Sequence, residues 1–569
     1  MREKFHCRRC EKISRGLKPF AVLGAKPHYA PDLPVKLEKL HLEAVVDPKK
    51  KTLKGVVKQT IRVIQPELTR ISLDQVDLNI EEVLFGKQRA EFSVQGQKLF
   101  ITLPKTMAHS KVGSEHEFSV RYHLHDPKRG LYFTSPDDAY PSKRYQVWSQ
   151  GQDEDTRYWI PTFDYPNQKA LTEVQVKVPK GFTAISNGAL VSKKDSADQT
   201  EFHYRLGVPH VTYLITLVVG EFAEWADTSQ NGLPVQYFVS PGREEDGKRA
   251  FSNTPEMIRV FSEKIGVPYP YEKYSQVAVQ DFIFGGMENT SSTTQTDRTL
   301  HDERAHLDFS SDPLVSHELA HQWFGDLLTC RDWSHGWLNE GFATFMERVW
   351  IENNIKDYGS PVQASDEAKY YGYADLKEYQ EEDATRYRRP IVCNTYLEPI
   401  NLFDCHLYQK GGLVLNLIRS VLGPELFWKS VQTYVTRHRG QNVETLDLIR
   451  AIEDTTGRNL RRLFDEWIFQ AGYPEFELTY QFHDGEGDKK RVELVIEQKQ
   501  TQGKQEIIHG TVVTPLFHLN VSVLITFSDG RKITQTVDAS EAKTRIFFIS
   551  WECYPQSKAV STPFTPPDH

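Results

Sequence analysis

The spacing of apolar residues along the chain changes twice. Between residue 35 and about residue 222, short segments either alternate apolar and polar side chains or are apolar throughout, and turn residues separate them. These segments are LEKLHLEAVV, VVKQTIRVI, KLFITL, HEFSVRYHL, EVQVKV and VTYLITLVVG. Alternation with a period of two residues is typical of strands that bury one face. We therefore predict an N-terminal tail over residues 1–34 and an all-β domain over residues 35–222.

From about residue 253, apolar residues recur every three or four positions instead. This spacing runs through TPEMIRVFSEKIG, PLVSHELAHQWFGDLL and NEGFATFMERVWIE, and it indicates helices that bury one side. It ends at the segment AGYP, residues 471–474, where glycine and proline stop a helix. We predict a mostly helical domain over residues 223–472.

Alternation returns in the last part of the chain. The segments FELTYQFH, RVELVIEQK, LNVSVLITF and TRIFFIS have the period of strands, and SDG at residues 528–530 is typical of a hairpin turn. They predict a β-sandwich over residues 473–569. Because a chain of 569 residues is too long for one hydrophobic core, the predicted fold class is a multidomain α+β protein.

The charge pattern excludes two classes of partner. Charged residues make up 26% of the chain and the net charge is -8, with acidic and basic residues interspersed. Since no basic block is present, we expect no nucleic-acid partner. The longest apolar stretch, residues 213–219, is much shorter than the roughly 20 residues needed to cross a bilayer, so we expect no membrane span.

Cysteine usage and the first residues suggest a cellular location. The first twenty residues mix basic and acidic side chains and lack the apolar segment of a secretory signal. The six cysteines, at positions 7, 10, 330, 393, 405 and 553, do not resemble a disulfide framework. We therefore predict a cytoplasmic protein. Cys7 and Cys10 have the spacing of half a zinc site, but no second pair completes it, and we favour an ordinary disordered tail.

One helical segment carries a metal-binding pattern, His317-Glu318-Leu319-Ala320-His321. Residues four apart on a helix share one face, so the imidazoles of His317 and His321 can reach the same ion. Glu318 lies beside them, where a carboxylate can accept a proton from water. The alternative is a surface helix that carries two histidines by chance.

A catalytic zinc ion needs a third protein ligand and an open position. Glu340 follows His321 with eighteen residues between them. We expect the first helix to end near residue 330 or 331, and a second helix to pack against it and point Glu340 at the ion. A solvated carboxylate is the usual alternative for glutamate, but bulky apolar residues flank Glu340. Glu347, seven residues further on, is a candidate partner for a ligand histidine.

A glycine-rich segment follows the strand-like residues 274–284. It consists of Gly285, Gly286, Met287, Glu288 and Asn289. Paired glycines allow another backbone to approach closely, so a peptide can add there as a strand, with Glu288 holding its protonated amine. A plain turn with a chance glutamate is the alternative.

Together these two motifs resemble the M1 family of zinc aminopeptidases, gluzincins that include aminopeptidase N and leukotriene A4 hydrolase. The pattern HExxH, eighteen residues and then E matches in full, and GGMEN resembles the family's exopeptidase motif. The resemblance covers about residues 35–569. It implies a saddle-like N-terminal β-domain, a thermolysin-like catalytic domain and a β-sandwich. It also implies one Zn²⁺ per chain and peptide substrates with a free N-terminus.

The resemblance extends to three further positions. The segment that contains Gln150 and Gln152 lies where family members carry a glutamine or glutamate that helps to hold the substrate's amine, and Gln152 is the matching residue. Tyr408 matches a tyrosine that donates a hydrogen bond to the oxyanion. Ile400 and Phe403 occupy the places of an acid and a second tyrosine that leukotriene A4 hydrolase uses on its epoxide. We therefore expect peptide hydrolysis without that second activity.

Two other functions stay open from the sequence. An endopeptidase can use the same zinc site, although the GGMEN segment argues against it. An inactive peptide-binding module is disfavoured because Glu318 and Tyr408 are both present. We also expect no counterpart of the C-terminal helical domain of many family members, so the chain is either a short enzyme or a fragment. Neither the oligomeric state nor the preferred first residue follows from the sequence.

Overall fold

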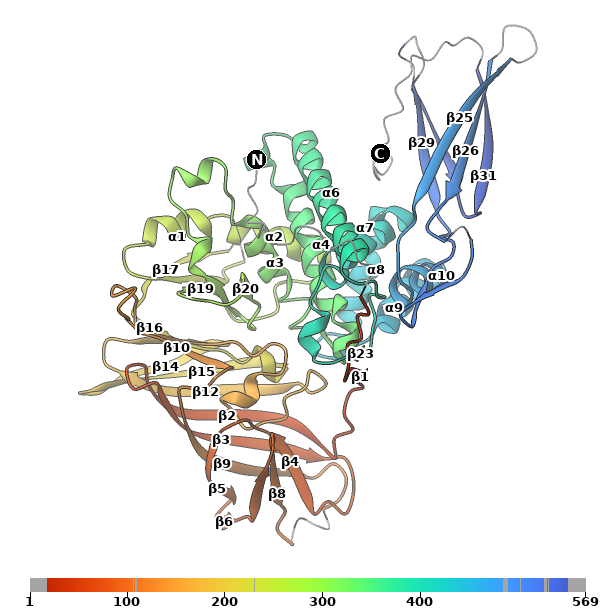
Figure 1. Ribbon diagram of the computed structural model, residues 1–569. Coiled ribbons are helices and arrows are strands. Elements are labelled where there is room, and N and C mark those ends of the chain that lie inside the picture. The colour runs from red at the N-terminus through yellow and green to blue at the C-terminus, as the bar shows by residue number, and fades with distance from the viewer. Residues whose placement is uncertain are drawn as a thin grey trace.

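The structure is a computed structural model that describes residues 18–550, except 106, 108–109, 230, 485–489, 502, 527–529 and 531. An N-terminal β region, a helical region and a pair of long C-terminal sheets follow one another in space (Figure 1). Cys7, Cys10 and most of the predicted turn at residues 528–530 lie outside the described residues. The multidomain α+β fold class is confirmed.

The N-terminal region is built around an eight-stranded sheet in the order β14-β15-β12-β2-β3-β9-β5-β6. Its strands are β2 (Val35–Asp47), β3 (Thr52–Val63), β5 (Asn79–Phe85), β6 (Gln88–Arg89), β9 (Glu115–His125), β12 (Ala170–Pro179), β14 (Ala189–Asp195) and β15 (Gln199–His210). The predicted alternation holds on β2, where Leu40, Leu42 and Ala44 are buried while His41 and Glu43 face away from the core. One face of the sheet therefore covers the core and the other is open to solvent.

Two smaller sheets complete this region. One contains β4 (Arg70–Asp74), β8 (Lys98–Thr102) and β7 (Phe92–Gln95); the other contains β10 (Leu131–Thr134), β11 (Gln146–Ser149), β16 (Leu217–Gly220) and β13 (Thr183–Ser186). Strand β11 ends next to Gln150 and Gln152, so it carries these two residues toward the helical region.

The middle region contains a mixed sheet, of which the sequence predicted only the strand-like segment at residues 274–284. Its strand order is β17 (Ala223–Thr228), β18 (Pro234–Val239), β19 (Tyr274–Val279), β21 (Ser292–Thr296) and β20 (Gly286–Met287). Strand β19 falls in that segment, and all six of its residues are buried, as is typical of a strand covered on both faces. Strand β20 forms one edge of the sheet, so its outer side is unpaired.

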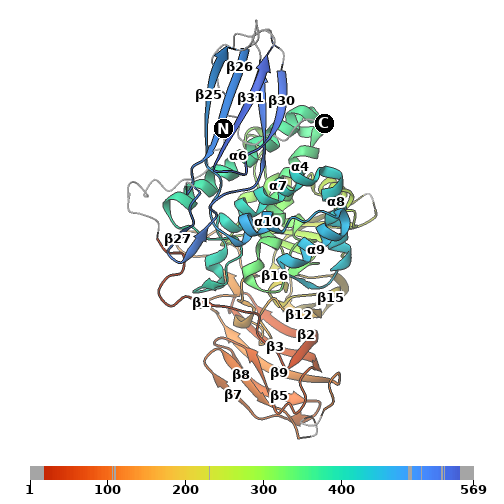
Figure 2. The same cartoon turned by 90° about the vertical axis from the view of Figure 1, so that its right-hand side faces the viewer.

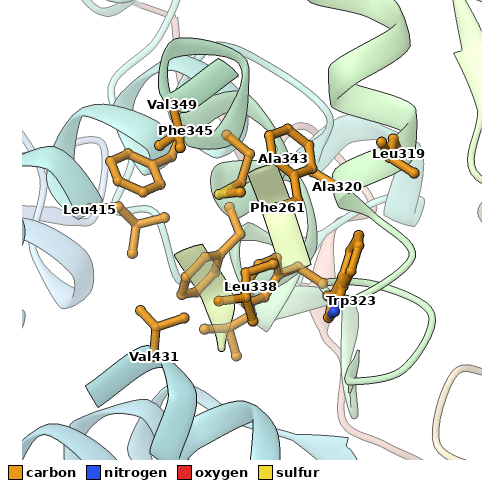
Figure 3. Packing of buried hydrophobic residues seen from close by; sticks show 14 of the residues in the cluster. Phe261, Leu319, Ala320, Trp323, Leu338, Ala343, Phe345, Val349, Leu415 and Val431 are labelled. Carbon is orange, nitrogen blue, oxygen red and sulfur yellow. The ribbon is translucent and has the colours of Figure 1, made fainter. Parts of the chain in front are cut away.

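Helices cover this sheet and form the largest core. They are α1 (Glu244–Ala250), α2 (Thr254–Ile265), α3 (Asp312–Ala320), α4 (Trp337–Asn353), α5 (Ile355–Tyr358), α6 (Pro361–Thr385), α7 (Gly411–Leu422), α8 (Pro424–Arg437), α9 (Thr445–Thr456) and α10 (Arg461–Phe464). Leu319 and Trp323 pack with Phe261 of α2, and Leu338 and Phe345 of α4 lie in the same cluster (Figure 3). The metal-motif helix α3 is therefore fixed from its apolar side.

Helix α3 ends at Ala320, about ten residues before the predicted end near residue 330. The chain turns because the φ angle of Gly325 is +133°, and its N–H bonds to the Leu328 carbonyl at 2.7 Å. A short strand, β22 (Thr329–Cys330), then leads to α4. The apolar residues after His321 pack in the core as a turn, which helical spacing alone does not distinguish from a helix.

The last region contains two facing sheets with a small core. One sheet has β25 (Phe476–Asp484), β26 (Lys490–Gln498) and β31 (Lys543–Ser550), and the other has β29 (Asn520–Thr526) and β30 (Lys532–Asp538). A hairpin of β27 (Glu506–Ile508) and β28 (Thr511–Val513) lies near the helices. Leu494, Ile496 and Val537 are buried between the sheets. Figure 2 shows these long strands extending away from the helical region.

Part of the predicted tail is ordered against the helical region. Strand β1 (Lys26–Pro27) pairs with β23 (Thr395–Tyr396), and the His28 ring stacks on the Tyr396 ring with centroids 4.1 Å apart. The segment before the β region therefore crosses the helical region first. In the described ranges, no helix has both the length and the apolar character needed to span a membrane.

Candidate metal centre and substrate-binding site

The three predicted metal ligands meet in one place, which we call the inner cluster: His317, His321 and Glu340. His317 lies on α3, His321 follows its last residue, and Glu340 lies in the first turn of α4. The Nε2 atoms of the two histidines are 3.1 Å apart, and Glu340 Oε2 lies 3.5 Å from His317 Nε2 and 3.2 Å from His321 Nε2. Donors about 2.1 Å from a tetrahedral zinc ion lie about 3.4 Å from each other. The donor set therefore fits zinc.

Both histidines are oriented by bonds at their other ring nitrogen. His317 Nδ1 lies 2.9 Å from Glu347 Oε1, and His321 Nδ1 lies 2.9 Å from the Phe324 carbonyl oxygen. Hydrogen bonds of this kind fix the tautomer that leaves Nε2 free to bind a metal. Although burial favours the protonated acid, the two imidazoles hold the pKa of the Glu340 carboxyl well below its usual range. The turn at Gly325 thus presents the Phe324 carbonyl to His321 and helps to orient its ring.

Glu318 is buried beside the inner cluster, and its Oε2 has no hydrogen-bond partner among the described residues. Burial raises the pKa of this carboxyl to about 8, although the neighbouring histidines oppose the shift. A carboxyl group of this kind can both take and return a proton near neutral pH.

The second glycine of the GGMEN segment packs directly on Glu318. A Cβ atom at Gly286 would overlap the Glu318 carboxylate, whereas one at Gly285 would lie 3.1 Å from the end of the Leu314 side chain. Gly286 therefore leaves the space that Glu318 occupies. The sequence suggested close approach of a backbone at these glycines, and at Gly286 the approaching group is this side chain.

Glu288 and Gln152 also meet at the inner cluster, from opposite regions of the chain. Gln152 Nε2 donates hydrogen bonds to Glu288 Oε1 at 3.2 Å and to Glu340 Oε1 at 3.1 Å. The Tyr213 hydroxyl donates to Glu288 Oε1 at 3.4 Å, and the Glu288 carbonyl accepts from Gln322 Nε2 at 3.1 Å. Burial, with the charge of Glu340 adding to it, raises the pKa of Glu288, although the charge of His321 opposes the shift.

The remaining residues of the two predicted binding segments have different surroundings. Met287 is buried in the core, and Asn289 Nδ2 donates to Thr294 Oγ1 at 3.2 Å, so both support the turn around Glu288. Gln150 is buried, and neither atom of its amide has a hydrogen-bond partner among the described residues. It is not in the hydrogen-bonded group of Gln152.

Tyr408 approaches the inner cluster from a π-helical turn, η7 (His406–Lys410). Its ring lies 5.9 Å from the His317 ring, centroid to centroid. Burial, reinforced by the charges of the nearby glutamates, raises the pKa of the Tyr408 hydroxyl well above 10, so it keeps its proton. Close backbone contact brings this turn to α4, since a Cβ at Gly411 would lie 3.0 Å from the Gly341 Cα.

A buried ionic network supports the turn, and the sequence did not reveal it. Asp404 accepts hydrogen bonds from the backbone N–H groups of His406 and Leu407, at 3.0 and 3.1 Å. Arg389 binds Asp404 through two nitrogens, at 2.8 and 2.5 Å, and also donates to the Leu402 carbonyl at 2.8 Å. The only sign of this network in the sequence is Asp404, just before the Tyr408 segment. Its partner, Arg389, lies fifteen residues earlier, so local spacing does not connect the two.

Ile400 and Phe403 precede this turn. Ile400 is 41% exposed, and the Phe403 ring packs against Trp333 and lies 6.4 Å from the Tyr408 ring. Neither side chain can donate a proton.

Comparison with known proteins finds two family domains in this chain. The Peptidase M1 N-terminal domain matches residues 26–214 and the Peptidase family M1 domain matches residues 249–467. "Aminopeptidase M1" of Arabidopsis thaliana is 31% identical over 62% of this chain and 40% of its own length. "Aminopeptidase 2, mitochondrial" of Saccharomyces cerevisiae is 29% identical over 84% of this chain and 50% of its own. The chain thus spans about half the length of these curated relatives or less.

Solved structures show the same fold. An M1 zinc metallopeptidase from Deinococcus radiodurans superposes with a TM-score of 0.63 at 24% identity, covering 78% of this chain and 95% of its own. A variant of that enzyme, bound to a Tyr-Ser-Ala substrate, superposes with the same score at 23% identity, over 77% of this chain and 95% of its own. The two family domains, in order and together spanning most of the chain, establish that this chain belongs to peptidase family M1.

Proposed function

We propose that this chain is a zinc-dependent aminopeptidase that hydrolyses the first peptide bond of peptides with a free N-terminus. The observation that carries the proposal is the contact of Gln152 with both Glu288 and Glu340, beside the two histidines. Two carboxylates within reach of one amide make a site for a cation, and the α-ammonium of a peptide is the cation that a peptidase meets. The names of the relatives support this proposal.

The inner cluster would hold one zinc ion per chain, bound by His317, His321 and Glu340. Bound zinc would supply an acidified water and polarise the substrate carbonyl. Because three protein donors leave an open position, the substrate can reach the ion.

Glu318 would be the general base and then the general acid. Its unpartnered Oε2 can take a proton from the attacking water as the new C–O bond forms. When the C–N bond breaks, the same carboxyl group returns this proton to the leaving amine. The proton that Glu318 takes from water is thus the one that it gives to the leaving amine.

Tyr408 would donate a hydrogen bond to the oxygen that gains negative charge during attack. A donor of this kind typically contributes roughly 3 to 4 kcal/mol in the transition state. Its high pKa supports this role, because the hydroxyl must keep its proton to act as a donor.

Specificity for the first bond would follow from Glu288 and Gln152. If their oxygens hold the α-ammonium, the carbonyl of the first residue is the one that reaches the reacting groups. Strand β20, at the edge of its sheet, can pair with the rest of the peptide through its backbone.

The test measures hydrolysis of matched peptides with free and acetylated N-termini by the full chain, with and without a chelator. Acetylation removes the charge, so we expect kcat/KM to fall by on the order of 10² or more. Chelation should abolish turnover, and added zinc should restore it. Efficient cleavage of the acetylated peptide would indicate an endopeptidase, and zinc binding without turnover would indicate a peptide-binding module. Cytoplasmic location stays a prediction.

A further inference from the structure

A second group of two histidines and one glutamate lies in the N-terminal β region, which we call the outer cluster: His41, Glu173 and His203. They belong to β2, β12 and β15, which are neighbours in the eight-stranded sheet. One ligand atom from each residue lies within 4.8 Å of the other two. The outer cluster has the same donor types as the inner cluster and shares no residue with it.

Strand pairing brings these side chains together. Glu173 lies opposite His41 in the parallel pair of β12 and β2. His203 lies opposite Gln175, which is two residues from Glu173 and therefore on the same face of β12. Since neighbouring strands are about 4.8 Å apart, the two imidazoles flank the Glu173 carboxylate from either side.

The outer cluster is accessible to an ion from solvent. Leu42, Val174 and Phe202, the neighbours of these three residues along the strands, are buried in the core. The cluster itself lies on the opposite, open face, where the side chains of His203 and Glu173 are 23% and 36% exposed. The Glu173 carboxylate and the His203 imidazole can therefore be reached from solvent.

The contacts within the cluster leave one donor unused. His203 Nε2 lies 3.1 Å from Glu173 Oε2, and the rings of His41 and His203 are nearly parallel, at 13°. His41 Nε2 is buried and has no hydrogen-bond partner among the described residues. A buried polar atom without a partner is unfavourable, and a ligand bound to that nitrogen would remove the penalty.

We propose that the outer cluster binds a divalent transition-metal ion, with Zn²⁺ as a fitting occupant. Two imidazoles and a carboxylate are donors that zinc, nickel and copper accept. An ion about 2.1 Å from each donor keeps the donors within about 4.2 Å of one another. Rotation of these half-exposed side chains suffices to close the cluster to that size, and water completes the coordination.

Nearby charges do not block the ion. Lys58, which lies opposite His41 on β3, pairs with Glu43 of β2, so its charge is matched by a carboxylate outside the cluster. Arg205 lies opposite Glu173 in the pair of β12 and β15, and the described residues show no ion pair between them. With neutral imidazoles, Glu173 gives the cluster a net negative charge that favours a cation.

A third group of similar residues shows what a non-binding cluster looks like. Glu382, Asp404 and His406 also place three donor atoms close together, but the Arg389 guanidinium already occupies both oxygens of Asp404. Among the described residues, no arginine or lysine forms an ion pair with Glu173, whose partner is His203. The outer cluster therefore differs from an ordinary buried ionic network.

An ion bound there would join three strands of one sheet. Since it binds the folded arrangement and not the separated strands, it would stabilise the N-terminal region by mass action. This role is independent of peptide hydrolysis.

The experiment is equilibrium dialysis of the zinc-loaded full chain against increasing Zn²⁺, with bound zinc counted by elemental analysis and thermal unfolding followed in parallel. The variants are His41→Ala, His203→Ala and Glu173→Gln. The matched control is His123→Ala, because His123 on the same sheet pairs with Glu81 at 2.7 Å as a two-residue contact.

The wild type should take up a second equivalent of zinc, and added zinc should raise its unfolding temperature. Each cluster variant should weaken that second binding step by at least about tenfold and lose the temperature shift, while peptide hydrolysis stays unchanged. His123→Ala should behave as wild type. Uptake of only one equivalent of zinc by the wild type would overturn the proposal. So would a second binding step in His41→Ala and His203→Ala that is as strong as in the wild type, or loss of the second equivalent in His123→Ala.

Discussion

The inner and outer clusters carry the same three donors in very different surroundings. In the inner cluster the side chains of His317, His321 and Glu340 are only 12%, 2% and 3% exposed, and both histidines have a second bond that fixes the ring. The outer cluster lies on an open sheet face, and His41 Nε2 has no partner there. The same donor types therefore occur in both clusters, and the two clusters differ in burial and in the bonds that orient their histidines.

Removal of the proposed base beside the inner cluster should have the largest effect on turnover. Glu318→Gln keeps a similar shape but cannot accept the proton, so turnover should fall by about 10² to 10⁴. Zinc content should stay at the wild-type level because the three ligands are intact. Steady-state kinetics with elemental analysis measures both, and unchanged turnover would remove Glu318 from the mechanism.

Removing the hydroxyl of Tyr408 should have the next largest effect. Tyr408→Phe should lower kcat by about 10² to 10³, with little change in KM, because the bond forms mainly in the transition state. Comparison of kcat and KM on one substrate checks this. An effect confined to KM would assign Tyr408 to substrate binding.

Gly286→Ala tests whether space around Glu318 matters as much as its charge. The added methyl group must displace the Glu318 carboxylate, and a shift of about 1 Å in a reacting group can reduce turnover by about 10². Gly285→Ala is the matched control, because its methyl group meets only the flexible end of Leu314. Equal loss in both variants would argue for a general distortion of this segment.

The smallest effect is expected when a ligand histidine of the inner cluster loses its charged partner, because its ring is then less firmly oriented. Glu347→Gln replaces the charged partner of His317 Nδ1 by a neutral amide, and loss of such a partner typically weakens metal affinity by about 10 to 100 fold. Competition with a zinc chelator measures the change. Wild-type affinity in this variant would show that the charge of Glu347 does not contribute to metal binding.

The sequence predicted the parts of this molecule that depend on local spacing. Residues four apart on a helix must share a face, so His317 and His321 were predictable, and alternation on β2 was clear. Strand β19 falls in the segment predicted as strand-like, but its pairing with β18 and β21 was not predicted, because strand order is not a local property. The end of α3 was misplaced because its continuation is equally apolar.

Long-range contacts account for the other omissions. Arg389 reaches Asp404 only because the chain folds back between them, and the contact of Gly286 with Glu318 joins a sheet edge to a helix. Nothing in local spacing marks His41, Glu173 and His203 as neighbours, since their meeting depends on strand order. The domain boundaries at residues 34, 222 and 472 stay predictions.

Gln152 links two regions of the molecule at the inner cluster. This side chain comes from the N-terminal β region, yet it bonds to Glu288 and Glu340 of the helical region. A ligand that binds across these residues favours the docked arrangement of the two regions, and by reciprocity firm docking raises its affinity. Under the proposed function, the affinity for a substrate amine would therefore depend on how closely the two regions are held, and substitutions at their interface far from the inner cluster would change it.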